Sequence, residues 1–186
     1  MEPNKSRIIQ AIGHVVSEAQ KKNVRATQYI IVKSLFIADR MHLNRFGRPI
    51  TFDNYVAMDH GPVPSFSYSI LKGEGKVGGI DTKNLPWRKK AAPDISKNAY
   101  VYLIPDNSDL ELDELSSSDL EALTEALIIV SSLSFLQLKK LTHEDPAYEA
   151  AWEGGDRRSY PMSYGLLFDV PDFARAEDLA FASRHP

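Results

Sequence analysis

The segment TQYIIVKSLFIADRMHLNRFGRP, residues 27–49, is the main evidence for the fold class. Between Thr27 and Phe46 its apolar residues, in the runs YIIV and LFIA, would surround a helix almost completely. Helices of this kind usually lie at the centre of a fold. The β-branched run could also form a strand over residues 29–32. However, a length of about twenty residues and the stop at Gly47-Arg48-Pro49 favour a helix.

More helices are predicted on both sides of this segment. Asn4 can cap an amphipathic helix whose apolar residues recur at helical spacing from Ile8 to Ala19. The other predicted helices are a short one from Pro64 to Gly73, two capped by Ser117 or Ser118 and by Ser134, a turn from Pro146 to Trp152 that ends at Gly154-Gly155, and two over residues 161–168 and 172–182.

Strand signals are few. Residues 99–104, AYVYLI, are aromatic and β-branched, and residues 87–92 precede them across a polar loop, which predicts an antiparallel hairpin. Residues 50–63 are expected to be extended or irregular because prolines disfavour helical angles before them, and Gly73 to Gly79 is expected to form a mobile loop. The sequence therefore predicts one mainly helical (α+β) domain over residues 1–186, with a small antiparallel hairpin or sheet.

Composition restricts the function classes. The 186 residues suffice to bury a core, and the absence of cysteine excludes disulfides, thiol catalysis and thiolate metal sites. No stretch has the apolar run of a signal peptide or membrane helix, so we expect a soluble, cytoplasmic protein without a membrane partner. The 22 basic and 25 acidic residues are nearly balanced, which indicates a protein or small-molecule partner rather than nucleic acid.

A metal-dependent hydrolase is one alternative. Asp39 and His42 share a helix face and could join His60 and His143 around zinc, manganese or iron, with water in an open position. The chain contains no His-Glu-x-x-His pair, however, and histidines more often cap helices or bond to the backbone. The residues themselves therefore predict neither a metal site nor a cofactor.

The stretch MDHGPVPS, residues 58–65, allows a second alternative. Asp59 and His60 could activate Ser65 or Ser67, but no nucleophile-elbow pattern flanks either serine. The structural interpretation is a rigid elbow, since Gly61 permits unusual backbone angles and Pro62 and Pro64 fix the exit. Similarly, Arg88-Lys89-Lys90 could contact phosphate but is more typical of a solvated strand edge.

Several ordered blocks together resemble a known family. They are KSLFIADRMHL at residues 33–43, FGRPI at 46–50, YVAMDHGPV at 55–63, LTH at 141–143 and DPAY at 145–148. In this order they resemble the Panacea antitoxin domain, over residues 5 to about 180. The departures at Ser34, Phe36 and Tyr148 are conservative. The helix-turn-helix domain of some relatives is absent, so direct operator binding is not expected.

The resemblance implies a prokaryotic or phage-associated antitoxin that binds a cognate toxin, often encoded beside it, and is not an enzyme. At least one member delivers its toxin to an ATP-dependent protease. No catalytic residue carries over. Eight residues match the motif and serve the fold or the partner: Lys33, Asp39, His42, Asp59, His60, Gly61, Pro62 and His143. Because of their loop settings and side chains, the candidate partner-binding residues are Arg45, Phe66, Tyr68 and Trp87.

Overall fold

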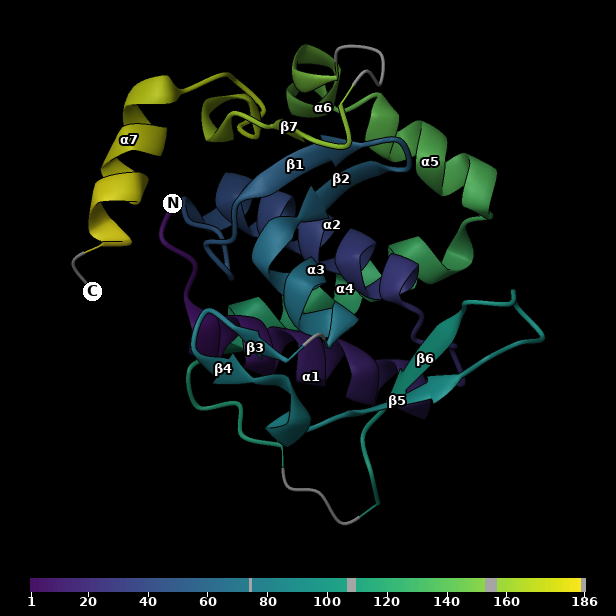
Figure 1. The fold of residues 1–186 in the computed structure, drawn as a ribbon. Coiled ribbons are helices and arrows are strands. Elements are labelled where there is room, and N and C mark those ends of the chain that lie inside the picture. Colours follow the sequence, from purple (N-terminus) through teal and green to yellow (C-terminus); the bar gives the residue numbers. More distant parts are fainter. Residues whose placement is uncertain (74, 107–109, 153–156, 185–186) are drawn as a thin grey trace.

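Helix α2, Gln28–Phe46, runs through the middle of the computed structural model, which describes residues 1–73, 75–106, 110–152 and 157–184 (Figure 1). The side-chain oxygen of Thr27 accepts a hydrogen bond from the backbone N–H of Ile30 at the start of the helix. The helix ends at Gly47, whose φ of 78° favours glycine. Side chains on several faces of α2 are buried, which confirms the predicted central helix.

The first hydrophobic core lies among α1 (Lys5–Lys21), α2, α3 (Ser65–Lys72) and α4 (Ser117–Ser132). Helices α1 and α4 pack against α2 and against each other. The predicted hairpin is confirmed as β5 (Arg88–Ala91) paired with β6 (Tyr100–Leu103). Two aromatic side chains from this region join the first core: Tyr102 of β6 and Trp87, the residue just before β5.

The second core lies beneath a three-stranded antiparallel sheet of order β2-β1-β7. Strand β1 pairs with β2 in a register from Tyr55 opposite Pro64 to Met58 opposite Gly61. Helix α2 contributes Phe36 and Leu43 to this core, so one helix is part of both cores. The elements around it are β1 (Tyr55–Met58), β2 (Gly61–Pro64), α5 (Phe135–His143), α6 (Pro146–Ala151), β7 (Tyr160–Pro161), the 3₁₀ helix η2 (Tyr164–Leu166) and α7 (Phe173–Ala182).

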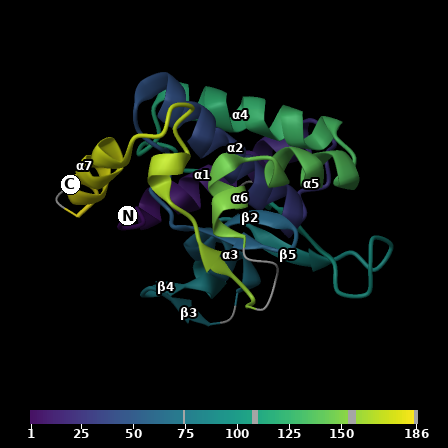
Figure 2. The ribbon, with the colours of Figure 1, turned by 90° about the horizontal axis from the view of Figure 1, so that it is seen from above.

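The two ends of the described chain lie side by side. Helix α7 lies at the edge of the molecule next to the N-terminus in both views (Figures 1 and 2). The backbone N–H of Glu2 donates a hydrogen bond to Ser183 Oγ over 2.9 Å. Within the described residues, no helix combines the length and the apolar character that spanning a membrane requires.

These elements confirm a mainly helical fold with small antiparallel sheets, but they correct several local predictions. Residues 55–64, expected to be extended or irregular, form a paired β-hairpin, and residues 161–168 contain the end of β7 and the 3₁₀ helix η2 instead of one continuous α-helix. Ser116, and neither Ser117 nor Ser118, caps α4. The segment predicted as a loop contains β3 (Lys76–Val77), which pairs with β4 (Ile80–Asp81) ahead of the 3₁₀ helix η1 (Thr82–Asn84). Gly154 and Gly155, expected to end α6, lie outside the described residues.

Candidate partner-binding site

Lys33 is a completely buried cation on α2. Its Nζ donates a hydrogen bond to the backbone oxygen of Pro62 in β2 over 2.9 Å and lies 5.4 Å from the ring centre of Tyr29. Burial, with a smaller contribution from the nearby charge of Lys139, lowers the pKa of Lys33 to about 7. Because burying a charge is costly without partners, this position is an unusual one for lysine.

Gly61 is the point at which three of the sequence blocks meet. Its φ of 95° is in the region that favours glycine. A Cβ at this position would lie 2.6 Å from Thr142 Oγ1 in α5 and 2.7 Å from Lys33 Nζ in α2. The elbow suggested by the sequence is thus the turn of the β1–β2 hairpin, held between two helices.

Asp39 uses its carboxylate to hold the chain that follows α2. It accepts hydrogen bonds from the backbone N–H groups of Ile50 and Thr51, over 2.8 and 3.0 Å, and from the Tyr55 hydroxyl over 2.8 Å. The Thr51 hydroxyl also donates to it. Burial raises the pKa of Asp39 to about 6, against these hydrogen bonds, which lower it. The carboxylate therefore has a complete set of protein partners.

His42 joins α2 to the N-terminus of α4. Its Nδ1 lies 2.8 Å from the backbone oxygen of Arg48, and its Nε2 lies 3.1 Å from Ser118 Oγ and from the carboxylate of Asp119. Arg48 also pairs with Asp119 over 3.0 Å, and Arg7 of α1 does so over 2.7 Å. Burial raises the pKa of Asp119, but hydrogen bonds from Arg48, Ser116 and Arg7 lower it to about 2. This cluster fastens three helices together.

These contacts do not support the metal-dependent alternative. The coordinating atoms of Asp39 and His42 already bond to the protein, whereas His60 lies on the exposed β1–β2 turn. The ring of His143 packs at a tilt against Tyr148, with the ring centres 4.3 Å apart, and burial lowers the pKa of His143. Among the described residues, no group of three or more metal-ligating side chains comes together. The serine alternative also lacks support, because the Ser67 hydroxyl donates to buried Asp53 over 2.7 Å.

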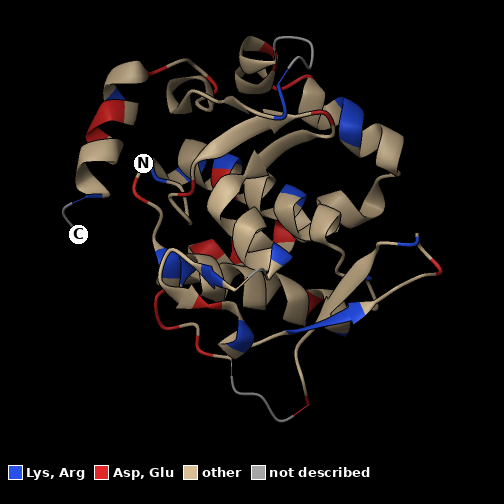
Figure 3. Cartoon of the chain, in the orientation of Figure 1, with Lys and Arg blue, Asp and Glu red and all other residues tan. Residues whose placement is uncertain are grey.

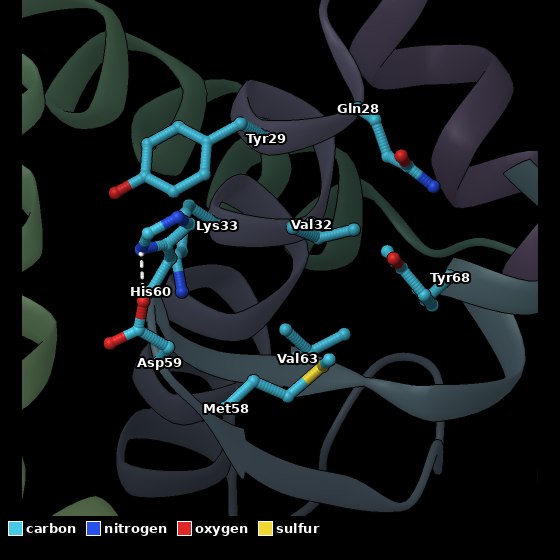
Figure 4. Close-up of a pocket in the computed structure, with 9 residues that line it drawn as sticks. All are labelled: Gln28, Tyr29, Val32, Lys33, Met58, Asp59, His60, Val63 and Tyr68. Carbon is cyan, nitrogen blue, oxygen red and sulfur yellow. Dashed lines mark ion pairs between the residues drawn. The ribbon is translucent and has the colours of Figure 1, made fainter. Parts of the chain in front are cut away.

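A cavity of about 200 Å³ lies beside Lys33 (Figure 4). Tyr29, Lys33, His60 and Asp59 gather at one end, and Asp59 pairs with Nδ1 of His60 over 3.3 Å. The rest of the lining is Gln28, Val32, Met58, Val63 and Tyr68. Within the part of the chain described, the Tyr29 hydroxyl and the Gln28 side-chain nitrogen are buried without a hydrogen-bond partner.

A second cavity of about 370 Å³ adjoins the first, since Gln28, Tyr29 and His60 line both. Three of the large apolar side chains around it remain exposed: Ile95 and Tyr100 of the β5–β6 hairpin and Phe135 of α5, whose exposed fractions are 45%, 42% and 49%. We call the two cavities together the Tyr29 groove. Aromatic side chains are enriched at protein-binding surfaces.

The four sequence-predicted partner-binding residues are not brought together. Tyr68 lines the groove, whereas Phe66 packs partly against the first core. Arg45 is exposed but pairs with Glu125 of α4 over 2.6 Å. Trp87, proposed as a partner-binding residue from its place near a loop, is 5% exposed and lies inside the first core.

The basic run Arg88-Lys89-Lys90 is exposed on β5, as expected for a solvated edge (Figure 3). Lys89 Nζ donates to the backbone oxygen of Lys72 over 3.0 Å and lies 4.2 Å from the ring centre of Tyr100. Arg25 pairs with Asp94 of the hairpin loop. Basic and acidic residues are interspersed along the ribbon in this view, which does not favour a nucleic-acid interface.

Sequence reasoning missed the residues that border the groove. Ile95, Tyr100 and Phe135 come from segments that no motif connects, and only the tertiary fold places them around Tyr29. One signal was available at Phe135-Leu136, where two apolar residues occupy the first turn of a short capped helix. That turn buries neither, and Leu136 is 75% exposed.

Comparison with known protein families gives a match to one described as Antitoxin SocA-like, Panacea domain, over residues 31–149. The match is shorter than the resemblance expected from the sequence, which extended over residues 5 to about 180. It nevertheless includes every sequence block named above, from Lys33 to Tyr148. No curated protein and no solved structure matches the chain significantly.

Proposed function

The chain belongs to the Panacea-domain family of SocA-like antitoxins, and we propose that it neutralises a toxin protein by binding it directly through the Tyr29 groove. The observation that supports this surface is the combination of exposed apolar side chains with buried, unpartnered polar atoms around one pair of adjoining cavities. The buried polar motif residues Lys33, Asp39 and His42 bond within the fold, so the family pattern itself serves mainly to build the scaffold.

The proposed role requires affinity and no catalytic step. Nanomolar affinity corresponds to about −12 kcal/mol. An interface of roughly 1,600 Å² can provide this when a few aromatic anchors fill pockets in the partner. Tyr100 and Phe135 are suitable anchors, because each is large and about half exposed. The absence of cysteine is compatible with the reducing cytoplasm in which the proposal places the complex.

Co-expression with the product of the neighbouring reading frame tests this function. The wild-type chain should restore growth to cells that produce the toxin, and the double variant Tyr100→Ala, Phe135→Ala should not. Ile128→Ala is a matched control, because Ile128 is also half exposed but lies on α4 outside the groove. Rescue by the double variant at equal protein levels would contradict the proposed surface, and lack of rescue by wild type would contradict the function.

Neutralisation by delivery to an ATP-dependent protease is a second mode that the family membership makes reasonable. The two modes differ in the fate of the toxin. Simple blocking leaves the toxin level unchanged after protein synthesis is stopped, whereas delivery shortens the toxin's half-life only in cells that contain the protease. Immunoblotting of the toxin in both backgrounds therefore distinguishes them.

A further inference from the structure

The smaller cavity of the Tyr29 groove presents hydrogen-bond donors at its polar end. An ammonium group has three donor hydrogens and no acceptor. Within the described residues, Lys33 Nζ donates a hydrogen bond to one acceptor, the backbone oxygen of Pro62. The Tyr29 hydroxyl has no partner there, although it is buried. Figure 4 shows both side chains at the end of the cavity where His60 also lies. Donors that exceed their acceptors in this way would be satisfied by an acceptor group from outside.

Apart from Gln28, the other lining of this cavity is mainly apolar. Val32, Val63, Met58 and the ring of Tyr68 lie beside and below the polar end in Figure 4. A ligand that fits therefore needs an acceptor next to an aliphatic or aromatic group. A cavity of about 200 Å³ accommodates a side chain or a chain terminus, but no folded segment.

The charges that face the cavity favour an anion. Lys33 of α2 and His60 of the β1–β2 turn line the cavity, and the charge of Lys139 in α5 is close enough to lower the pKa of Lys33. The opposing carboxylate is Asp59, which is 74% exposed and lies 3.3 Å from His60 and 3.7 Å from Lys139. Asp59 is therefore paired with His60 and Lys139, and among the described residues no carboxylate pairs with Lys33.

We propose that this cavity binds a carboxylate of the toxin that lies next to an apolar side chain, with Lys33 Nζ and the Tyr29 hydroxyl as its hydrogen-bond donors. The inference deepens the proposed function, because it names the chemical group that the toxin inserts. A charge-assisted hydrogen bond to a buried ammonium would be stronger than one between neutral groups. It would also compensate for the burial of Lys33.

Matched peptides test the chemistry without the toxin. N-acetyl-leucine against N-acetyl-leucinamide represents a chain terminus, and N-acetyl-Leu-Glu-amide against N-acetyl-Leu-Gln-amide represents an acidic side chain. Each is titrated into the full chain while the methyl resonance of Met58, which lines the cavity, is followed by NMR. At least one acid should bind about tenfold more tightly than its amide. The pair that discriminates identifies the source of the carboxylate.

Two variants test the assigned donors. Tyr29→Phe removes one hydroxyl, and Lys33→Met removes the ammonium while keeping an unbranched side chain only one atom shorter. Each should weaken the discriminating acid by about five- to tenfold and leave its amide unaffected, whereas Ile128→Ala should change neither. Thermal melting monitors the fold, and Tyr29→Phe carries the test alone if Lys33→Met does not fold.

Equal binding of acid and amide, or no shift of Met58 up to about 20 mM peptide, would overturn the inference. Neither result would affect the growth-rescue test of the function, which is measured on the toxin and on Tyr100 and Phe135. Conversely, a protein that binds the acids but fails to rescue growth would retain the carboxylate site and lose the antitoxin role.

Discussion

Gly61 has two constraints, its backbone conformation and its surroundings. Gly79 has a similar φ of 87°, but a Cβ there would have no atom within 4 Å, whereas one at Gly61 would meet Thr142 and Lys33. We expect Gly61→Val to lower the free energy of unfolding by about 1–3 kcal/mol more than Gly79→Val does. Urea unfolding of both variants measures this. Equal losses would mean that only the backbone conformation matters at Gly61.

The lowered pKa of Lys33 leads us to expect that the stability of the protein rises with pH. The unfolded chain keeps this proton up to a pKa of about 10.4, whereas the folded protein loses it above about pH 7. Between these values the unfolded state binds more protons, so the free energy of unfolding rises with pH. Relative to Lys33→Met, the wild type should gain on the order of 2 kcal/mol between pH 7 and 9.

Urea unfolding of both proteins at pH 7, 8 and 9 checks this expectation. The difference between them isolates Lys33, because the other titrating groups are common to both. A difference that stays constant, or that shrinks as pH rises, would show that the Lys33 ammonium is well solvated or well paired in the fold.

At the scale of elements, Asp53 stabilises helix α3, which starts twelve residues further along the chain. Helix α3 begins after Pro64, which offers no side-chain cap. Instead, the buried carboxylate of Asp53 accepts hydrogen bonds from the backbone N–H groups of Phe66 and Ser67, over 2.9 and 2.7 Å. Its burial raises the pKa, while these hydrogen bonds lower it. The carboxylate thus joins the chain before β1 to the start of α3.

We expect Asp53→Ala to destabilise the protein by about 2–3 kcal/mol, because it leaves buried backbone donors without an acceptor. Asp81→Ala is the control, since Asp81 caps the exposed η1 by accepting from Lys83 N–H. It should cost less than about 1 kcal/mol. Thermal and urea unfolding measure both. If Asp53→Ala cost no more than the control, α3 would not depend on this cap.

Elements with strong local signals could be predicted from sequence, and those determined by long-range pairing could not. Thr27, Gly47 and an apolar run define α2, and a run of aromatic and β-branched residues defines β6. The hairpin at residues 55–64 was missed because Pro62 and Pro64 argue against a strand. They are tolerated because β2 is the edge strand of its sheet, where a missing N–H leaves no partner unpaired.

The candidate site was predictable only in part, for the same reason. The motif positions are visible as ordered sequence blocks, but the sequence does not reveal that Lys33, Pro62 and Thr142 meet in space. The sequence also does not distinguish Trp87, which precedes β5 and is buried in the core, from Tyr100, which begins β6 and remains about half exposed. Both depend on how the hairpin lies against α1 and α2.

At the scale of the whole molecule, α2 makes the two cores interdependent. Trp87 lies in the first core and Trp152 packs against the second, and these are the two tryptophans of the chain. Because α2 belongs to both cores, we expect residues 1–186 to unfold as one cooperative unit. The fluorescence transitions of Trp87→Phe and Trp152→Phe should each coincide with the loss of helical circular dichroism. Two separate midpoints would indicate two domains.

The affinity of the complex between this chain and the toxin from the neighbouring reading frame tests the central claim most directly. Isothermal titration calorimetry on purified proteins should give nanomolar binding for the wild type and for Ile128→Ala. The affinity should fall by about a hundredfold or more for Tyr100→Ala, Phe135→Ala, with the fold intact. Wild-type affinity in that double variant, or no binding by the wild type, would contradict neutralisation through the Tyr29 groove.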